Sequence, residues 1–415
     1  MAIQTEVLVV GGGVIGVCCA YYLRRAGLGV DLIEQDQIGS GCSHGNAGLI
    51  VPSHSVPLAA PGVLLKGLKW MWNPESPFYL KPRADLAFLA WLSRFAWASR
   101  EAAAMRAIPP LRDLLQASRR LFDELYDSGA VSFFYDRRGF LNLYRSAEAI
   151  AEGMKEVELL GRFGIKARAA GIEEVRSIAP MVQASVVGGI LHEEDAHLQP
   201  REFVTGLAAA AEAIGARVHR GIGVDRFETA GGRVARVIAG KVEFEPKHVV
   251  LATGSWTPEI ARCLPVDVPI QPAKGYSITC KRPASFPAVP LGFTERKVVA
   301  TPMGSTLRFG GTLELAGFDG SINQRRVSAI RKAVPLYLNG VEALEELEVW
   351  RGFRPCTPDG LPMIGRAPAL DNLVLATGHG MLGMSLGPVT GLLLSEIIRE
   401  QRPTFDLTPF RPGRF

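Results

Sequence analysis

The sequence predicts an α/β fold of two domains, on three observations. The chain has 415 residues, more than the roughly 250–300 at which one hydrophobic core stops growing. A strand, a glycine-rich turn, a helix and a second strand follow one another within residues 7–34, as in a βαβ unit. Short continuous apolar runs return much later in the chain, and such runs are typical of strands in a sheet covered on both faces.

Composition and charge exclude several classes of protein. Hydrophobic residues make up 47% and charged residues 21% of the chain, which fits a globular protein with a large core. The formal net charge of +5 is modest and no long Lys/Arg run occurs, so we expect no nucleic-acid partner. Six cysteines without a C-x-x-C pair argue against a disulfide framework or a structural zinc site. The segment from His192 to His197 lacks the spacing of a zinc protease, so no metal site is expected.

The first βαβ unit is defined by its apolar pattern and its glycines. We expect a strand at Val7–Val10, a helix over about Val14–Ala26 and a second strand at Val30–Glu34. Gly27 follows the helix, where a glycine commonly ends it. Met1–Glu6 lack the basic region of a signal peptide, so a cytoplasmic protein is expected.

Further segments extend this first sheet, and two insertions separate them. Later strands are expected at Ala216–His219, Val234–Ile238, Val249–Ala252 and Leu373–Ala376, followed by a final helix over about Gly387–Arg399. An insertion from Trp70 to about Asp127 reads as mostly helical and is expected to break at Pro109-Pro110. A second insertion, residues 269–314, alternates between apolar and polar residues and predicts an antiparallel sheet.

These segments predict a discontinuous first domain into which a second domain is inserted. We place 1–81, 197–262 and 345–415 in the first domain, and 82–196 and 263–344 in the second. The second domain is expected to be α+β, with a mostly antiparallel sheet. The segment Leu86–Ala98 is very apolar but too short to span a membrane. Whether this segment docks on the protein core, a membrane or a partner stays open.

Three glycines between the first strand and the first helix predict a dinucleotide site. Gly11, Gly13 and Gly16 form a G-x-G-x-x-G pattern. The first allows a tight turn, the second lets the backbone approach a pyrophosphate, and the third lets the helix pack against the strand. Glu34 ends the second strand, where an acidic side chain binds the adenosine ribose and disfavours the 2′-phosphate of NADP. The first domain is therefore expected to be Rossmann-like.

Two more loops of small residues favour FAD over NAD as the dinucleotide. The segment 40–48 follows soon after Glu34 and offers backbone N–H groups to a long cofactor. The segment 377–385 is rich in glycine and enters the final helix, whose N-terminus would place positive partial charge beside a flavin. Either loop alone is an ordinary turn, but together with the first motif they indicate FAD.

A set of short strings along the chain carries a family resemblance. The strings are Gly11–Gly16 with Glu34, Asn46-Ala47-Gly48, Ala59-Ala60-Pro61-Gly62, Lys69-Trp70-Met71, Lys274-Gly275-Tyr276-Ser277, Gly310-Gly311-Thr312, Gly352-Phe353-Arg354-Pro355, Thr357-Pro358-Asp359-Gly360 and Gly378-His379-Gly380. Through them nearly the whole chain resembles the D-amino acid oxidase superfamily of FAD-dependent oxidoreductases. The strings at 59–62 and 274–277 make it most similar to the bacterial D-amino acid dehydrogenases.

The resemblance implies an activity and roles for three residues. The activity is oxidative deamination of D-amino acids to 2-oxo acids and ammonia, with hydride transfer from Cα to flavin N5. Arg354 is expected to bind the substrate carboxylate bidentately. Tyr276 is expected to contact the substrate and His379 to lie near the flavin, although a purely structural role is the alternative for both. Electrons are expected to pass to a quinone or another carrier.

The expected FAD site collects residues from all three loops and from the later strands. The residues expected to bind the cofactor are Gly11, Gly13, Val14, Ile15, Gly16, Glu34, Gln35, Ser43, His44, Asn46, Ala47, Gly48, Val224, Thr253, Gly254, Trp256, Gly378, His379, Gly380, Met381, Leu382 and Gly383. His44 is displaced from the histidine that links FAD covalently in some relatives, so non-covalent FAD is expected.

Alternative functions stay open at this point. A D-proline or cis-4-hydroxy-D-proline dehydrogenase, or a glycine- or sarcosine-type amine oxidase, would use the same chemistry. A flavin-binding subunit without turnover belongs to a different class, and a pyridine-nucleotide dehydrogenase would be colourless when purified. The sequence also leaves open the oligomeric state and a peripheral contact with the inner face of the cell membrane.

Overall fold

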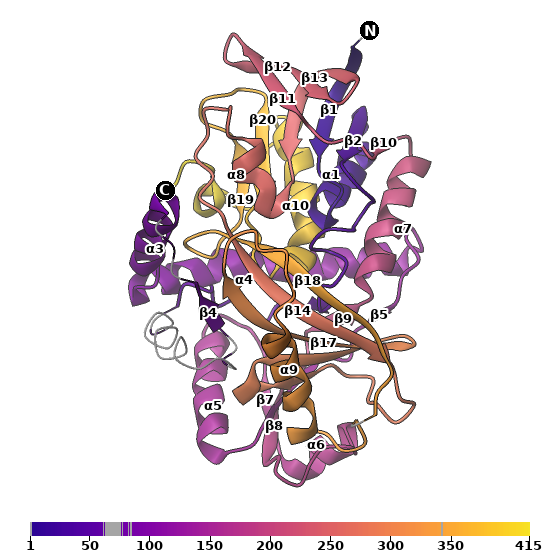
Figure 1. The fold of residues 1–415 in the computed structure, drawn as a ribbon, viewed down its shortest axis with the longest axis vertical. Helices are drawn as coiled ribbons and strands as arrows, with labels where there is room; N and C mark the ends of the chain where they lie inside the picture. Colours follow the sequence, from indigo (N-terminus) through magenta and orange to yellow (C-terminus); the bar gives the residue numbers. More distant parts are fainter. Residues whose placement is uncertain are drawn as a thin grey trace.

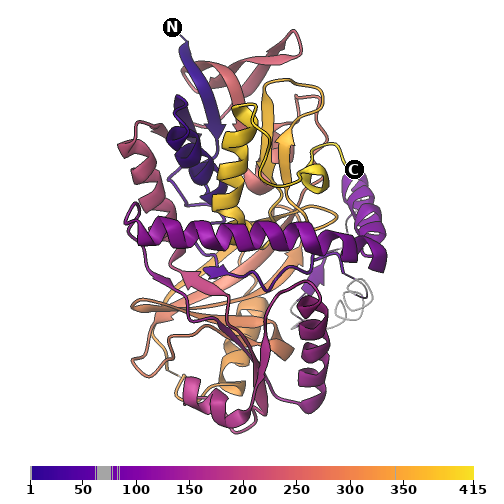
Figure 2. The ribbon, with the colours of Figure 1, turned by 180° about the vertical axis from the view of Figure 1, so that it is seen from behind.

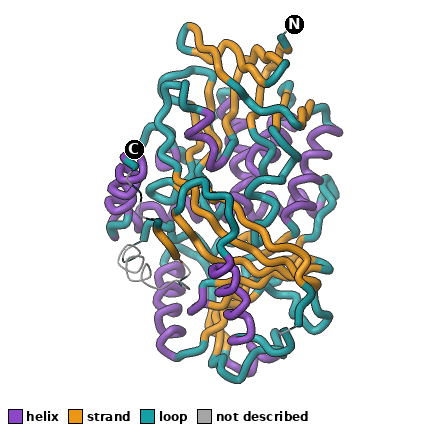
Figure 3. Tube along the Cα trace, in the orientation of Figure 1, coloured by secondary structure: helices purple, strands orange, loops and turns teal. Residues whose placement is uncertain are grey.

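Two β-sheets, one above the other along the long axis, organise the molecule (Figure 1). The structure is a computed structural model and describes residues 2–60, 62, 76, 78–81, 83, 85–341 and 343–415. Strands of the first sheet run along the long axis, and those of the second sheet cross it (Figure 3). The α/β class is confirmed. Pro61 and Lys69-Trp70-Met71, which carry part of the family resemblance, lie outside the described residues.

The first sheet has a parallel centre, as its apolar strands predict. In order across the sheet the parallel strands are β10 (Arg217–Arg220), β2 (Val30–Glu34), β1 (Ile3–Val10), β13 (Val242–Leu251) and β20 (Leu373–Thr377). The antiparallel additions are β11 (Arg226–Ala230) and β12 (Arg233–Ala239) beside β13, and β19 (Met363–Arg366) beside β20. β1 and β13 begin earlier than predicted because their polar first residues pair with each other, as Gln4 does with Glu245.

Helices pack behind this sheet and against one another. They are α1 (Val14–Arg25), α4 (Glu101–Asp127), α7 (Pro200–Ala213) and α10 (Gly383–Ile398). α1 and α10 approach closely, because a Cβ at Gly391 would lie only 2.5 Å from the carbonyl oxygen of Cys18. α4 crosses the molecule over α10 and lies in front of it in the view of Figure 2. Cys18 and Cys19 are fully buried in α1, where they act as small hydrophobic residues.

α4 continues through Pro109 and Pro110, so the predicted break is wrong. A proline inside a helix removes one hydrogen bond, and its ring crowds the preceding turn. The carbonyl groups that lose their partners belong to Met105 and Arg106, which are not buried, so water can hydrate them. The core holds the helix together on either side of the prolines. The buried residues there are Ala104, Ala107, Ile108, Leu111 and Leu114.

The second sheet is mostly antiparallel, as predicted for the inserted domain. Its order is β18 (Glu346–Cys356), β14 (Gln271–Lys281), β17 (Thr306–Leu315), β16 (Val298–Met303), β15 (Leu291–Phe293), β6 (Phe140–Tyr144), β8 (Gly188–His192) and β7 (Arg168–Ala170), with β4 (Phe78–Leu80) beside β17. Only the β15–β6 and β17–β4 pairs are parallel among the described strands of this sheet. The helices against it are α9 (Gln324–Ala333), α5 (Ala147–Gly161) and α6 (Ile172–Ile178).

The remaining elements connect the two sheets. A small sheet contains β3 (Leu49–Ile50), β9 (Ala196–Leu198) and β5 (Tyr135–Asp136), and the short or peripheral helices are α3 (Leu86–Ala98), α8 (Thr257–Ile260), η1 (Gly254–Trp256), η2 (Thr294–Arg296), η3 (Val334–Leu336) and η4 (Thr408–Phe410). The predicted domain boundaries stay a prediction. β18 pairs in the second sheet, whereas α4 packs on helices of the first. In the described parts of the chain, no helix combines the length and the apolar character of a membrane span.

Candidate active site

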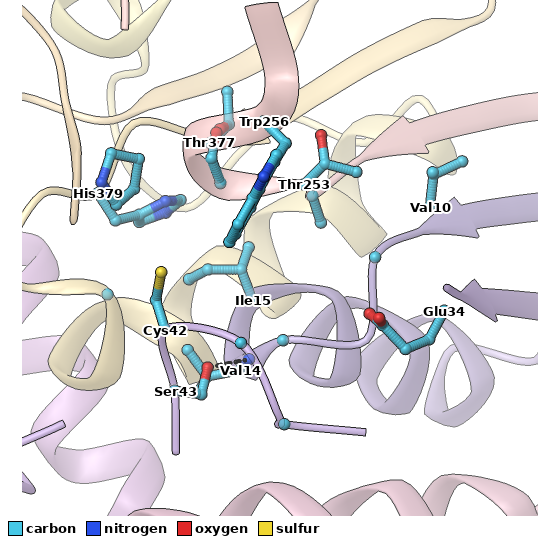
Figure 4. A pocket seen from close by; sticks show the side chains of 18 of the residues that line it. Val10, Val14, Ile15, Glu34, Cys42, Ser43, Thr253, Trp256, Thr377 and His379 are labelled. Atoms are coloured by element: carbon cyan, nitrogen blue, oxygen red, sulfur yellow. Dashed lines mark hydrogen bonds between the residues drawn. The ribbon is translucent and has the colours of Figure 1, made fainter. Parts of the chain in front are cut away.

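A cavity of about 340 Å³ lies at the carboxyl ends of the parallel strands β1, β2, β13 and β20. This edge is where open parallel sheets bind ligands. Residues from all three predicted loops line the cavity, and Figure 4 shows several of them converging on it. The predicted cofactor residues that line it are Gly11, Gly13, Val14, Ile15, Glu34, Gln35, Ser43, Asn46, Val224, Thr253, Gly254, Trp256, His379, Gly380, Met381 and Gly383.

The turn between β1 and α1 leaves open space in front of Gly13. Gly11 has a φ of +107°, and a Cβ there would lie 2.7 Å from the carbonyl oxygen of Ala252. A Cβ at Gly16 would lie 1.8 Å from the carbonyl oxygen of Gly11, so this glycine lets the helix pack on the turn. At Gly13 a Cβ would meet only Ser43 Oγ, at 3.5 Å. The packing of the protein does not require a glycine at 13, and the space is available to a pyrophosphate.

Glu34 ends β2 beside this turn. Its Oε2 accepts a 2.6 Å hydrogen bond from the N–H of Gly12, and its Oε1 accepts one of 3.0 Å from the N–H of Asp36. These bonds orient the carboxylate at the cavity (Figure 4), where it can accept hydrogen bonds from ribose hydroxyls. Gly12, a variable position in the motif, is constrained too, since a Cβ there would lie 2.5 Å from Cδ1 of Ile38.

The second loop holds the turn from the other side. The N–H of Val14 donates a 3.0 Å hydrogen bond to Ser43 Oγ (Figure 4). Asn46 lines the cavity, and its Oδ1 accepts a 2.8 Å hydrogen bond from the N–H of Gly48. Gly48 is required by packing, because a Cβ there would lie 2.2 Å from the carbonyl oxygen of Leu198. The loop is therefore fixed by contacts that its sequence does not reveal.

Some predicted cofactor residues do not line this first cavity. Ala47 and Leu382 line a neighbouring one instead. His44 lines neither, and its Nε2 lies 2.9 Å from Oε1 of Glu348. Gly378 also lines neither, and a Cβ there would lie 2.5 Å from a threonine methyl group. Contacts of these residues with a cofactor stay predictions.

The third loop leads into α10 and carries His379. This side chain is buried, and its Nε2 lies 3.0 Å from Oγ1 of Thr390 in α10. Burial lowers the pKa of His379 to about 3, so the ring is neutral. It lines the cavity on the side of Trp256 and Thr377 (Figure 4). A neutral histidine held by α10 is compatible with a position beside the flavin. It is equally compatible with a purely structural role.

A second cavity of about 390 Å³ lies beside the first, against the second sheet. The residues that line both cavities are Cys42, Asn46, Arg354 and Met381. Glycines of β14, β17 and β18 line the second cavity, namely Gly275, Gly310, Gly311 and Gly352. Because glycine has no side chain, this part of the sheet can approach a ligand closely. The two cavities together therefore offer adjoining spaces for a cofactor and a substrate.

Arg354 of β18 lies where the two cavities meet. Its guanidinium packs over Gly275, where a Cβ would lie 2.1 Å from Nη1. Nη1 donates a 3.0 Å hydrogen bond to the carbonyl oxygen of Thr312. Among the described residues no carboxylate forms an ion pair with Arg354, and burial lowers its pKa. A buried charge without a partner is unfavourable, so this guanidinium is available to an anionic ligand.

Tyr276 lines the second cavity, but its hydroxyl faces a buried polar cluster. The hydroxyl donates to a carboxylate oxygen of Glu314 and accepts a 3.3 Å hydrogen bond from the N–H of Asn323. Nζ of Lys274 lies 3.8 Å from Glu314 and 3.3 Å from Asp319. Burial and Glu314 raise the pKa of Tyr276. The hydroxyl is thus satisfied within the protein, and substrate contact by Tyr276 stays a prediction.

Sequence reasoning missed several residues that line these cavities. Sγ of Cys42 lies 2.7 Å from the carbonyl oxygen of Phe353, to which it donates, and burial raises the pKa of Cys42 to about 11. The ring of Trp350 lies over Gly45 and Gly352, where a Cβ would be 2.0 and 1.9 Å from ring carbons. Gly45, next to one string of the resemblance, and Gly352, which opens another, were the available signal for a large side chain between them.

Comparison with known proteins bears directly on this cofactor site. The family model described as FAD dependent oxidoreductase (DAO) matches residues 6–397. The chain belongs to this family. The expected resemblance is confirmed, and FAD is the cofactor of this FAD-dependent oxidoreductase. The cavity fits the cofactor, because open space remains in front of Gly13 and the oriented Glu34 carboxylate lies beside it.

Curated relatives of this FAD-dependent oxidoreductase extend over nearly its whole length. A D-amino acid dehydrogenase of Cereibacter sphaeroides is 31% identical over 97% of this chain and 93% of its own. The D-amino acid dehydrogenase of Methylobacterium radiotolerans is 33% identical over 99% of both chains. That of Methylobacterium nodulans is 33% identical over 96% of both.

Solved structures show the same fold at lower identity. Glycine oxidase from Geobacillus kaustophilus superposes with a TM-score of 0.81 at 21% identity and covers 100% of both chains. L-proline dehydrogenase from P. horikoshii gives a TM-score of 0.78 at 19% identity over 100% of this chain and 98% of its own. These likenesses support the fold of two sheets.

Proposed function

We propose that this FAD-dependent oxidoreductase is a D-amino acid dehydrogenase. The observation that carries the proposal is the half-buried guanidinium of Arg354, which lines both cavities and has no carboxylate partner among the described residues. The names of the curated relatives support the same substrate class. The reaction oxidises the Cα–N bond to an imine, which water hydrolyses to a 2-oxo acid and ammonia.

The residues that line the second cavity have different tasks in this reaction. Arg354 holds the α-carboxylate through two parallel hydrogen bonds, which fixes both the position and the tilt of the substrate. Gly275 gives room to that guanidinium and Gly352 to the ring of Trp350, and both glycines line the second cavity. When bound, FAD accepts the hydride that leaves Cα. The amine nitrogen loses its proton to water as the C=N bond forms, and Tyr276 forms part of the wall that positions Cα.

We assign the cofactor-binding residues from the first cavity. Gly13 and the first turn of α1 bind the pyrophosphate, and Glu34 binds the adenosine ribose. His379 and Gly380 lie beside the isoalloxazine at the N-terminus of α10. FAD is held without a covalent bond. In support, His44 is engaged by Glu348, and the Cys42 thiol has a raised pKa that disfavours its nucleophilic form.

The electron acceptor is a quinone or another carrier, reached by peripheral contact with a membrane. α3 supports this contact, because one face packs on the protein while the other is apolar and exposed. Leu86, Leu89 and Trp97 on the outer face are 84%, 51% and 66% exposed. Sedimentation with lipid vesicles tests the contact, and Trp97→Ser should reduce the bound fraction. Equal sedimentation of both proteins would contradict it.

Anaerobic mixing of the yellow holoenzyme with a panel of D- and L-amino acids tests the proposed activity. We expect D-amino acids to bleach the flavin absorbance and L-amino acids to leave it unchanged. The reduced protein should then be reoxidised faster by a soluble quinone analogue than by oxygen. Absence of bleaching by every D-amino acid would remove the proposal.

A further inference from the structure

The second cavity carries two polar groups that stand apart from Arg354, namely His54 and Lys297. Lys297 directly precedes β16, whereas Arg354 lies in β18. β17 and β14 lie between these strands, so three strand spacings, about 14 Å, separate the two backbone positions. Both long side chains line the same cavity, and the Arg354 guanidinium reaches the carbonyl oxygen of Thr312 in β17, the strand that pairs with β16.

His54 faces the cavity without a hydrogen-bond partner among the described residues. Its ring packs edge-on against Phe140, with 6.1 Å between ring centroids. The residue is exposed to the cavity, yet desolvation by the enclosing protein and the charge of Lys297 lower the pKa of His54 to about 4, so the ring is neutral. A neutral imidazole offers one N–H donor and one acceptor nitrogen. A ligand in the cavity can use either.

The backbone that carries His54 is held in place by a buried carboxylate. Asp195 accepts hydrogen bonds from the N–H of Ser53 at 3.1 Å and from its hydroxyl at 2.6 Å. The N–H of His54 donates to the carbonyl oxygen of Val51 at 3.1 Å. The ring is therefore pre-organised before a ligand enters. Much of the neighbouring wall is apolar, with Leu49, Val51, Leu58, Phe78, Val299 and Leu313.

We propose that His54 and Lys297 bind an oxygen atom on the side chain of the substrate. This inference rests on the proposed function and narrows its substrate class to D-amino acids or cyclic D-imino acids with a side-chain hydroxyl or carboxylate. Arg354 binds the α-carboxylate, and His54 and Lys297 bind the second oxygen in the same cavity. Lys297, which has no acidic partner among the described residues, disfavours substrates with cationic side chains.

Two matched substrate pairs test the proposal with the holoenzyme. cis-4-Hydroxy-D-proline and D-proline differ by one hydroxyl, and D-glutamate and D-norvaline differ by a carboxylate in place of a methyl group. The rate of anaerobic flavin reduction gives kcat/KM for each. We expect the oxygen-bearing member to be preferred about tenfold or more in at least one pair, because a site built to hydrogen-bond a polar group rejects the analogue that lacks it.

Variants separate recognition from packing. His54→Phe should lower the preference about tenfold, and His54→Gln should recover part of it because the amide can still donate. Lys297→Asn should lower the preference in the glutamate pair only, and asparagine tolerates the φ of +52° at this position. Lys166→Asn, at an exposed lysine outside both cavities, is the matched control and should leave both preferences unchanged.

The outcomes distinguish this inference from the proposed function. If D-amino acids reduce the flavin but the ratio of kcat/KM within each pair is near one, the inference is overturned and the proposed function stands. The same holds if His54→Phe leaves that ratio unchanged. If His54→Phe lowers kcat/KM equally for both members of each pair, His54 only supports packing, and this result also overturns the inference. Failure of every D-amino acid to reduce the flavin would overturn both.

Discussion

A guanidinium that is buried without a carboxylate loses its hydration and regains favourable contacts only when an anion binds. Arg354 is in this situation at the junction of the two cavities. Among the described residues its one hydrogen bond, from Nη1 to the carbonyl oxygen of Thr312, leaves the other guanidinium N–H groups for a ligand. Substrate binding is therefore where a change at this residue should be measured.

Arg354→Ala should lower kcat/KM for D-amino acids about 30-fold or more, since truncating one partner of a buried charge pair costs roughly 2–5 kcal/mol. Arg354→Lys should retain part of the activity, because a lysine keeps the charge but loses the bidentate geometry. Steady-state kinetics measure both. Arg331→Ala, which removes an exposed ion pair with Glu346, is the control. Unchanged kinetics for Arg354→Ala would show that another group binds the carboxylate.

Asp195 is a second buried group with a measurable consequence. Burial raises the pKa of Asp195 to about 7 from an ordinary value of 3.8, against the opposing effect of the Ser53 hydrogen bonds. Between these two pH values the folded protein keeps a proton that the unfolded chain has released. The free energy of unfolding must therefore fall as the pH rises through this range, by up to about 1.4 kcal/mol per pH unit, and level off above pH 7.

Asp195→Asn should remove this contribution to the pH dependence, because an amide cannot ionise and still accepts a hydrogen bond from Ser53. Denaturant unfolding at several pH values between 4 and 8, on both proteins, measures it. We expect the variant to gain stability relative to the original as the pH rises. Parallel curves would mean that Asp195 is not the group responsible.

At this scale the sequence could indicate Arg354 and Gly13, because each lies in a recognisable string. Asp195, His54 and Lys297 gave no such signal. Asp195 meets Ser53 only because the turn before β9 folds beside the segment that follows β3. Lys297 reaches the cavity only through the pairing of β16 with β17. These neighbours are far apart in the chain, and no local pattern records their contact.

The geometry of some elements of the fold depends on a few glycines and prolines. The turn between β1 and α1 contains two glycines with opposite requirements. A Cβ at Gly16 would strike the carbonyl oxygen of Gly11, whereas a Cβ at Gly13 would meet only Ser43 Oγ at an ordinary distance. Gly13 has a φ of −72°, which alanine also adopts.

Gly13→Ala should therefore fold normally but bind FAD at least tenfold more weakly, because the added methyl group occupies the space proposed for the pyrophosphate. Gly16→Ala should lower the stability of the apoprotein itself. Thermal unfolding of the apoproteins and titration with FAD separate the two effects. Normal FAD affinity in Gly13→Ala would place the pyrophosphate elsewhere.

α4 offers a prediction about stability without any role in the site. Pro110→Ala should stabilise the protein by about 1–2 kcal/mol, since a helix-interior proline costs about 3 kcal/mol, partly offset by the stiffer unfolded chain. Pro265→Ala, at an exposed loop position, should be neutral or slightly destabilising. Denaturant unfolding compares the two, and a loss of stability in Pro110→Ala would contradict the argument.

Elements with strong apolar periodicity were predictable, and β2 was predicted with its observed ends. The continuation of α4 through two prolines was not, because the packing of residues such as Leu111 and Leu114 overrides the local preference. The short strands β3, β5 and β9 were also missed. They contain two or three residues each, and only their pairing defines them.

The whole molecule is joined around its cofactor site. The first cavity takes residues from β1, β2, β13, β18 and β20, or from loops that follow them, and so connects the two sheets. A ligand that binds only the folded protein stabilises it in proportion to the logarithm of its concentration, by about 4 kcal/mol at 1,000 times its Kd.

Removal of FAD should therefore lower the Tm of the whole protein in one cooperative step. Adding FAD back should raise the Tm progressively with concentration. Differential scanning calorimetry of apoprotein and holoprotein measures the shift, and Gly13→Ala serves as the weak-binding control. A Tm independent of FAD would mean that the cofactor does not connect the two sheets as the cavity implies.

At the scale of the molecule, the two-sheet architecture could be predicted from the separated nucleotide-fold segments and the inserted strands. The assignment of particular helices and strands to one domain or the other could not be predicted. β18 follows the predicted boundary at residue 345 and yet pairs with β14 along the edge of the second sheet. Such pairing depends on edges that exist only after the rest has folded.

The crevice proposed for the coenzyme has one wall at Gly11 and another at Gly380, far apart along the polypeptide. During translation the first wall emerges from the ribosome long before the second. Flavin loading must therefore wait until the segment around Gly380 has been made, and a nonsense codon upstream of β20 should yield a colourless product.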